Sequence, residues 1–316
     1  MKLYICDSVN GKTTKEIVKW FTDRGHDVVY EMNYDPRNVD WADTTLCEWA
    51  DNNAVQMDKW FWDDWALGAK GKYNWKKKNL VLRPMDIEIY TGYYRGLNWK
   101  HWNHLVYVSK QTYNHMKIDA NFPKTLKIHH IPLSVDMNEW TFKKRGKGRN
   151  IGYIGNVWEA KNFPMIVQVM DLLRRKSKKP WRLYWLGRWD YSGTYDWMTY
   201  YRDNIVNELG IDLIHTEYAD SVDEWMEQID YLVTVSLKDA FSIIVAEAMA
   251  KGIKAFPHNF AGAKDIWGKY VWSSLSELVD RILHEEYDSF EYRDFIINNY
   301  SNEKIMPKWE RVLKPK

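Results

Sequence analysis

The sequence predicts an α/β protein with two domains. Its 316 residues exceed the usual size of a single domain. Strand-like apolar runs alternate with helical patterns in both halves, which is typical of parallel sheets covered by helices. A basic, glycine-broken segment at 143–149 separates the halves and reads as a linker. Hydrophobic residues form 45% of the chain, enough to fill two cores.

The first domain is expected to span residues 1–142. It begins with a strand–helix–strand pattern, and Gly25 ends the first helix. The expected strands are 2–6, 26–31, 39–46, 79–83, 105–108 and 126–131. The expected helices are 13–24, 51–67 and one that begins at Lys110 with Ser109 as its cap.

The second domain is expected to span 150–285 and repeats the alternation. Its expected strands are 150–154, 181–186, 211–214, 231–235 and 253–256. Its expected helices are 163–176, 195–209, 222–228, the helix between Ser242 and Gly252, and 274–284. Helical patterns at 289–299 and 302–313 indicate that residues 286–316 form a helical tail packing back on the first domain.

One stretch, from Ser236 to Gly252, places two acidic residues around a strand–loop–helix junction. Asp239 lies in the loop and Glu247 lies inside an apolar helix. Ser242 is the expected N-cap and Gly252 the expected C-terminal stop. Buried carboxylates are rare unless a polar group meets them. A helix N-terminus favours phosphate, so a diphosphate could bind here with an acid on either side for hydroxyl groups.

Two further groups follow strands of the first domain. Asp86 and Glu88 come directly after the strand at 79–83, where α/β folds usually bind ligands, although acids also favour a first helical turn. The loop Asn10-Gly11-Lys12 could bring backbone N–H groups and a lysine near an anion, but it lacks a phosphate-loop fingerprint and also fits an ordinary turn.

The composition limits the classes of binding partner and the cellular setting that fit this chain. The formal net charge of +2 gives no general indication of nucleic acid, whereas 19 Trp and 21 Tyr could stack on sugars or bases. The basic run at 76–78 fits a solvated face or an anionic acceptor. Cys6 and Cys47 form no disulfide framework or zinc spacing, which favours a reducing, cytoplasmic setting. No signal peptide or membrane span is expected, and peripheral membrane contact stays open.

The pattern Ser-x-x-Asp-x-Phe-x5-Glu-Ala-Met-Ala-x-Gly over residues 236–252 resembles the Glu-x7-Glu motif of retaining GT-B glycosyltransferases, especially glycosyltransferase family 4. Four other segments are similar to family elements in the same order. They are Val106–Ser109, His129–Asp136, Ile151–Asn156 with Lys161–Phe163, and Asn259–Ala263. The resemblance implies two Rossmann-like domains facing each other across a cleft, with a C-terminal tail crossing back to the first.

The resemblance also implies roles for individual residues on the donor side. Glu247 would accept hydrogen bonds from the ribose hydroxyl groups, and Asp239 would meet the donor sugar. Backbone N–H groups of Phe241 and Ser242 would bind the diphosphate beside Gly155 and Asn156. Lys161 would neutralise the diphosphate as the nucleotide leaves.

On the acceptor side, Asp86 or Glu88 would orient or deprotonate the acceptor, and the loop of Asn10, Gly11 and Lys12 would lie nearby. The implied reaction transfers a hexose from a UDP- or GDP-sugar to a glycan, lipid or nucleic acid base, without a metal or other cofactor.

Two departures from the family pattern leave alternatives open. Asp239 stands where the family has a longer Glu, and Asn156 stands where it has an Arg, a cation that Arg188 from the next loop could replace. A sugar-nucleotide binding protein without catalysis is therefore one alternative. A viral-type DNA base glycosyltransferase is a second, and a GT-B epimerase fits the motif order less well.

Overall fold

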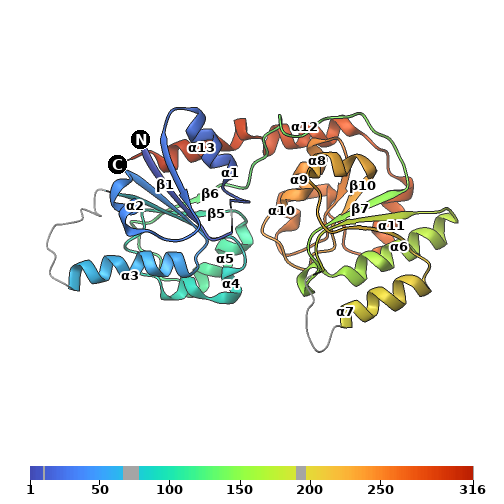
Figure 1. Cartoon of the computed structure of the whole chain (residues 1–316), viewed down its shortest axis with the longest axis horizontal. Helices are drawn as coiled ribbons and strands as arrows, with labels where there is room; N and C mark the ends of the chain where they lie inside the picture. Colours follow the sequence, from blue (N-terminus) through green and yellow to red (C-terminus); the bar gives the residue numbers. More distant parts are fainter. Residues whose placement is uncertain (10, 67–77, 190–196, 316) are drawn as a thin grey trace. The chain divides into compact units, whose positions relative to one another are not determined.

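The computed structural model describes residues 1–9, 11–66, 78–189 and 197–315, with the backbone alone at 60–66. Within these ranges the chain forms two compact units (Figure 1). Unit 1 contains Met1–Ser134 together with Tyr300–Lys316, and unit 2 contains Val135–Asn299. The chain therefore leaves unit 1, builds unit 2 and returns to unit 1 with its last residues.

Unit 1 holds, among its described residues, a six-stranded parallel sheet in the order β2-β1-β3-β4-β5-β6. Alternate residues of β1 face opposite sides: Leu3 and Ile5 join one apolar cluster, and Tyr4 and Cys6 join the other. The sheet is thus buried on both faces, as parallel sheets usually are. The strands are β1 Lys2–Asp7, β2 Asp27–Glu31, β3 Thr44–Glu48, β4 Asn79–Arg83, β5 His104–Tyr107 and β6 Lys127–His130.

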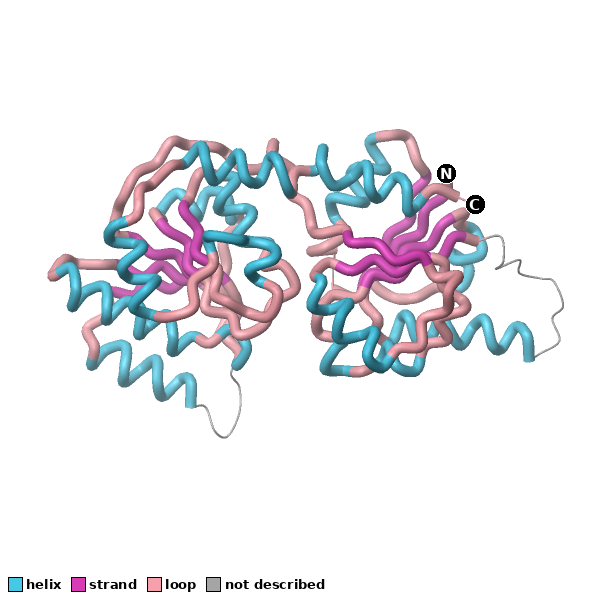
Figure 2. Tube along the Cα trace, turned by 180° about the vertical axis from the view of Figure 1, so that it is seen from behind, coloured by secondary structure: helices cyan, strands magenta, loops and turns pink. Residues whose placement is uncertain are grey.

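Helices cover both faces of this sheet (Figure 2). Helices α1 and α13 bury Ile17, Phe21 and Trp309 in one cluster, whereas α2, α3 and α5 bury Val39 and Met116 among others in the second. Ser109 caps α5 as expected, because its Oγ accepts from Thr112 N at 3.2 Å. The helices are α1 Lys15–Asp23, α2 Pro36–Trp41, α3 Asn52–Ala66, α4 Glu88–Thr91, α5 Lys110–Asp119 and α13 Asn302–Leu313.

Unit 2 holds a five-stranded parallel sheet in its described part, in the order β11-β10-β7-β8-β9. Helices α6 and α11 share one apolar cluster with the sheet, in which Phe163, Trp185 and Leu278 are fully buried. The strands are β7 Asn150–Ile154, β8 Arg182–Leu186, β9 Asp212–Thr216, β10 Tyr231–Val233 and β11 Lys254–Phe256. The helices are α6 Phe163–Ser177, α7 Trp197–Tyr200, α8 Val222–Trp225, α9 Ile243–Ala250, α10 Ala263–Trp267, α11 Leu275–His284 and α12 Ser289–Asn299.

One expected strand is present but displaced. Residues 39–46 were expected to hold a short strand, and β3 does begin there, but only at Thr44, because α2 occupies the first part of the range. Asp35 explains the helix, since its side chain accepts from Arg37 N and Pro36 occupies the first turn. In unit 2, the helix expected at 195–209 starts at Trp197 within the described residues and continues as a wider turn at Tyr201–Val206.

The division into units also differs from the expected boundaries. The basic segment 143–149 belongs to unit 2, where Arg145 pairs with Glu227 at 2.7 Å and Arg149 N donates to Asp230 at 2.8 Å. The expected tail divides as well, because α12 belongs to unit 2 and α13 to unit 1. The glycine and basic residues of segment 143–149 predicted an exposed linker, but the ion pair and the hydrogen bond hold this segment against unit 2.

Among the described residues, no helix combines the length and the apolar character needed to cross a bilayer.

Candidate functional site

The junction between β10 and α9 is built around Asp239. Its Oδ1 accepts from Ser242 N at 2.8 Å and from Phe241 N at 3.2 Å. Ser242 occupies the N-cap position in the left-handed region, with φ 63°, and its hydroxyl makes no cap bond. Ser242 is therefore the N-cap residue as expected, but its side chain does not cap α9, and the Asp239 carboxylate instead holds the backbone of the loop that leads into the helix. The same carboxylate engages the two N–H groups expected to meet a diphosphate.

Lys161 meets Asp239 at this helix start. Its Nζ lies 3.2 Å from Asp239 Oδ2 and 3.4 Å from Ser236 Oγ. The loop after β7 and the loop after β10 are tied together, since Leu237 N donates to Ala160 O at 2.8 Å. The side chains of Lys161 and Asp239 are 27% and 17% exposed, so solvent reaches the pair. Two residues expected in one site, 78 positions apart, are thus in contact.

The loop after β7 also packs closely on the loop after β8. A Cβ on Gly187, whose φ is 150°, would lie 2.2 Å from Gly155 O, so only glycine fits there. Asn156 Oδ1 accepts from Arg188 N at 3.0 Å. Asn156, which stands where the family has an arginine, therefore holds the backbone of the loop that carries Arg188. The Arg188 side chain is exposed, and its guanidinium lies 5.8 Å from the ring of Tyr218.

Glu247 lies on α9, about one turn from the helix start at Ile243. It is half-buried, whereas its neighbours Ala246 and Ala248 are fully buried. Its carboxylate therefore belongs to the partly accessible side of an otherwise apolar helix. This placement suits a group that accepts hydrogen bonds from a ligand at the edge of the sheet.

Glu88 of unit 1 is a structural group. It is 1% exposed, and its carboxylate accepts from Ala50 N at 2.8 Å and from Met85 N at 3.0 Å. It thereby fastens the segments that follow β3 and β4. Burial raises the pKa of Glu88 to about 7, against the backbone N–H groups that favour the carboxylate. Asp86, in contrast, is half-buried and keeps a partly accessible position.

The raised pKa of Glu88 makes a prediction about stability. Between pH 4.5 and about 7 the native state holds a proton that the unfolded state has released, so stability falls as pH rises. We expect Glu88→Gln to remove this component, whose slope is at most about 1.4 kcal/mol per pH unit. Urea unfolding of both proteins across this range measures it. Parallel curves for the two proteins would contradict the assignment.

The loop at Gly11 is an ordinary helix entry. Gly11 has φ 73°, and its carbonyl accepts from Thr14 N at 3.2 Å and from Lys15 N at 2.9 Å. Lys12 is exposed beside it. Asn10, like Lys76 and Lys77 of the basic run, lies outside the described residues. The geometry adds no second anion-binding group to this loop.

The described residues hold no cluster of three or more His, Cys, Asp or Glu side chains placed to bind a metal ion.

A comparison with protein families finds one match, to the family described as "Glycosyl transferases group 1", over residues 148–281. The match contains Lys161, Asp239 and Glu247, and it ends within α11. This part of the chain is therefore similar to glycosyl transferases group 1. A search of curated protein sequences finds no significant match.

Solved structures similar to the whole chain include glycosyltransferases. A glycosyltransferase from Rickettsia africae ESF-5 is 15% identical with a TM-score of 0.71, over 99% of this chain and 98% of that one. Anabaena HepE, in complex with UDP and glucose, is 11% identical with a TM-score of 0.72, over 98% of both chains. These likenesses confirm the GT-B fold, with one α/β unit before the residues that match the family model and one containing them.

Staphylococcus aureus TarM, in a complex with UDP, is 14% identical with a TM-score of 0.66. The match covers 86% of this chain and 55% of TarM. The chain therefore spans about half the length of TarM.

A buried polar network in unit 1 was missed at the sequence level. Arg83 Nε lies 2.6 Å from Glu48 Oε2, and Arg83 Nη2 donates to Thr13 O at 2.7 Å. Beside it, Asp7 accepts from Thr14 Oγ1 at 2.6 Å and from Trp49 Nε1 at 3.0 Å. Asp7, Glu48 and Arg83 each form the last residue of a strand. A charged residue at the end of each apolar strand was the sequence signal that could have revealed this network.

Proposed function

We propose that the chain is a retaining, metal-independent glycosyltransferase that moves a hexose from a nucleotide-diphosphate sugar to a hydroxyl or other acceptor. The contact of Lys161 with Asp239 at the start of α9 carries the proposal. It puts a cation and a sugar-binding carboxylate at a helix terminus, where N–H groups of the first turn have no intrahelical acceptor.

The reaction breaks the bond between the anomeric carbon and the diphosphate oxygen and forms a bond from that carbon to the acceptor oxygen on the same face. Negative charge develops on the leaving diphosphate. Lys161 stabilises it electrostatically, which is a role that a divalent metal fills in other enzymes. Asp86 is the proposed group that takes the acceptor proton, because Glu88 is committed to backbone N–H groups.

Asp239 and Glu247 bind different parts of the donor. In the proposal Asp239 accepts from hydroxyl groups of the sugar, and Glu247 accepts from those of the ribose. Binding of the diphosphate requires Asp239 to share Lys161 and the N–H groups that it now holds. Arg188 adds a cation from the neighbouring loop, which Asn156 orients through the backbone. UDP is the favoured nucleotide, because HepE and TarM are recorded with it.

Glu247→Ala is expected to weaken UDP binding by about 10- to 100-fold, because a hydrogen bond to a charged group is lost at a half-buried position. Isothermal titration of the full chain with UDP and UDP-glucose measures it. Asp86→Ala is the matched control, a carboxylate in the other unit that should leave UDP binding unchanged. Absence of binding to any UDP-, GDP- or ADP-sugar would contradict the proposed function.

A sugar-nucleotide binding protein without catalysis is the second candidate. Asn156 favours it, since an uncharged side chain that accepts from Arg188 N stands where the family has an arginine. Tight binding of a nucleotide sugar without turnover, across glycan, lipid and DNA acceptors, would support this candidate over the enzyme.

A further inference from the structure

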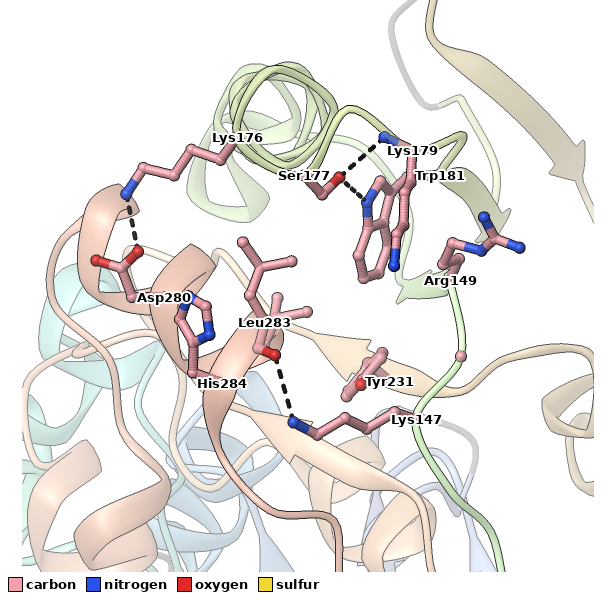
Figure 3. Close-up of a pocket in the computed structure, with 12 residues that line it drawn as sticks. Lys147, Arg149, Lys176, Ser177, Lys179, Trp181, Tyr231, Asp280, Leu283 and His284 are labelled. Carbon is pink, nitrogen blue, oxygen red and sulfur yellow. Dashed lines mark hydrogen bonds and ion pairs between the residues drawn. The ribbon is translucent and has the colours of Figure 1, made fainter.

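Unit 2 contains a cavity of about 780 Å³ that lies outside the donor site (Figure 3). Its wall is formed by the end of α6, the end of α11 and the segments that lead into β7, β8 and β10. The lining includes Lys147, Arg149, Lys176, Lys179 and Asp280. This volume falls in the range of small-molecule pockets.

The cavity lies at the amino-terminal ends of the strands, whereas the donor site lies at their carboxyl-terminal ends. Arg149 immediately precedes β7, and Tyr231 is the first residue of β10. The donor groups Gly155 and Ser236 instead follow those strands. A five-residue strand spans roughly 16 Å, so one small ligand cannot occupy both places. A ligand of this cavity therefore binds independently of a sugar nucleotide.

Positive charge converges on the cavity from two basic stretches, 143–149 and 174–179. One lining cation is neutralised, since Lys176 Nζ lies 2.9 Å from Asp280. Lys147 Nζ donates to the uncharged carbonyl of Leu283, at 3.3 Å. In the described part of the chain, Lys147, Arg149 and Lys179 form no ion pair. Three lining cations thus have no acidic partner among the described residues.

An apolar, preorganised surface lies beside these cations. Ser177 Oγ accepts from Trp181 Nε1 at 2.8 Å and from Lys179 N at 3.3 Å, so one hydroxyl fixes the indole ring and the lysine next to it (Figure 3). Tyr231 and Ile282 also line the cavity and are buried in the same apolar cluster as Trp181. A compact ligand that carries phosphate and a less polar body matches this combination of groups better than a long polyanion does.

We propose that this cavity is a second ligand site, which binds a compact phosphorylated molecule such as a sugar phosphate. Lys147 and Lys179 hold the phosphate, Arg149 adds charge at the mouth, and the remainder of the ligand lies on Trp181. The proposal does not depend on the function assigned to the donor site.

The test uses the full chain with excess UDP present, titrated calorimetrically with pyrophosphate and with glucose 6-phosphate. We expect saturable binding at one site, weakened at least tenfold in Lys147→Ala/Lys179→Ala. The control variant, Lys144→Ala/Lys178→Gly, removes two exposed cations from the same stretches that do not line the cavity. Glycine suits position 178 because its φ is 53°. The control should stay within twofold of the parent.

A parallel titration of Lys161→Ala separates the two sites. Second-site binding should survive this change, whereas its loss would show that the probe occupies the donor site and would overturn the proposal. Equal weakening in both lysine double variants, or no binding of either probe, would also overturn it. Binding only of an oligonucleotide or of anionic lipid vesicles, with steep salt dependence, would indicate a general electrostatic attraction of the basic surface and would contradict a specific pocket.

Discussion

Replacing Lys161 with alanine is expected to lower kcat about 10²- to 10³-fold. Loss of one preorganised group that stabilises transition-state charge typically has an effect of this size. Lys161 contacts Asp239 at 3.2 Å at the start of α9, and in the proposed reaction the charge on the diphosphate increases as the sugar leaves. Binding of UDP should weaken less than the rate falls, because the ground state carries less of this charge.

The rate is measured as release of UDP from UDP-glucose, in single-turnover and steady-state experiments. Lys238→Ala, in the same loop, is the control and should retain most of the activity. The melting temperature of Lys161→Ala should stay close to that of the parent, because solvent reaches the ion pair. If affinity for UDP and rate fall by the same factor, Lys161 binds the ground state and is not a transition-state group.

The largest expected effect on stability comes from the ion pair of Glu48 and Arg83. Their side chains are 0% and 1% exposed. Glu48→Ala leaves the guanidinium buried without its anion, which costs about 3–5 kcal/mol of unfolding free energy. The hydroxyl of Thr13 also loses its acceptor, Glu48 Oε1, at 2.7 Å. Urea unfolding, followed by circular dichroism, measures the change.

A double replacement distinguishes a buried charge from a packing defect. Glu48→Leu/Arg83→Met removes both charges and keeps apolar volume, so it should recover most of the stability lost by Glu48→Ala. A double variant as unstable as the single one would contradict this, and would indicate that the hydrogen bonds to Thr13 carry the effect.

The alternation of strand-like apolar runs with helical patterns along the chain was sufficient to predict most of the fold. The expected strands at 79–83 and 150–154 have the same bounds as β4 and β7, and the helices at 289–299 and 302–313 match α12 and α13. Continuous apolar runs bounded by glycine or polar residues give strong signals in buried parallel sheets. The strand expected within residues 39–46 begins late, at Thr44, because Asp35 and Pro36 start a helix that the apolar pattern does not reveal.

The sequence predicted that Lys161 and Asp239 belong to one site, but it did not predict their hydrogen bonds. The order of motifs brought Lys161 and Asp239 together across 78 positions. Spacing could not show that the Ser242 hydroxyl makes no cap bond, or that Asp239 accepts from the N–H groups of Phe241 and Ser242. Nor could it show that Glu88 turns inward, since an acid after a strand fits both an exposed ligand group and a buried acceptor of backbone N–H groups.

The return of the chain to unit 1 determines when that unit can fold during synthesis. Helix α13 supplies Ile305, Met306 and Trp309 to the cluster around β1, and Asn79 Nδ2 donates to Val312 O at 2.8 Å. Until α13 has emerged from the ribosome, the face of the unit 1 sheet that α1 and α13 share lacks part of its cover. Unit 2 needs nothing beyond Asn299 and can therefore fold first, so the unit made second is the first that can be completed.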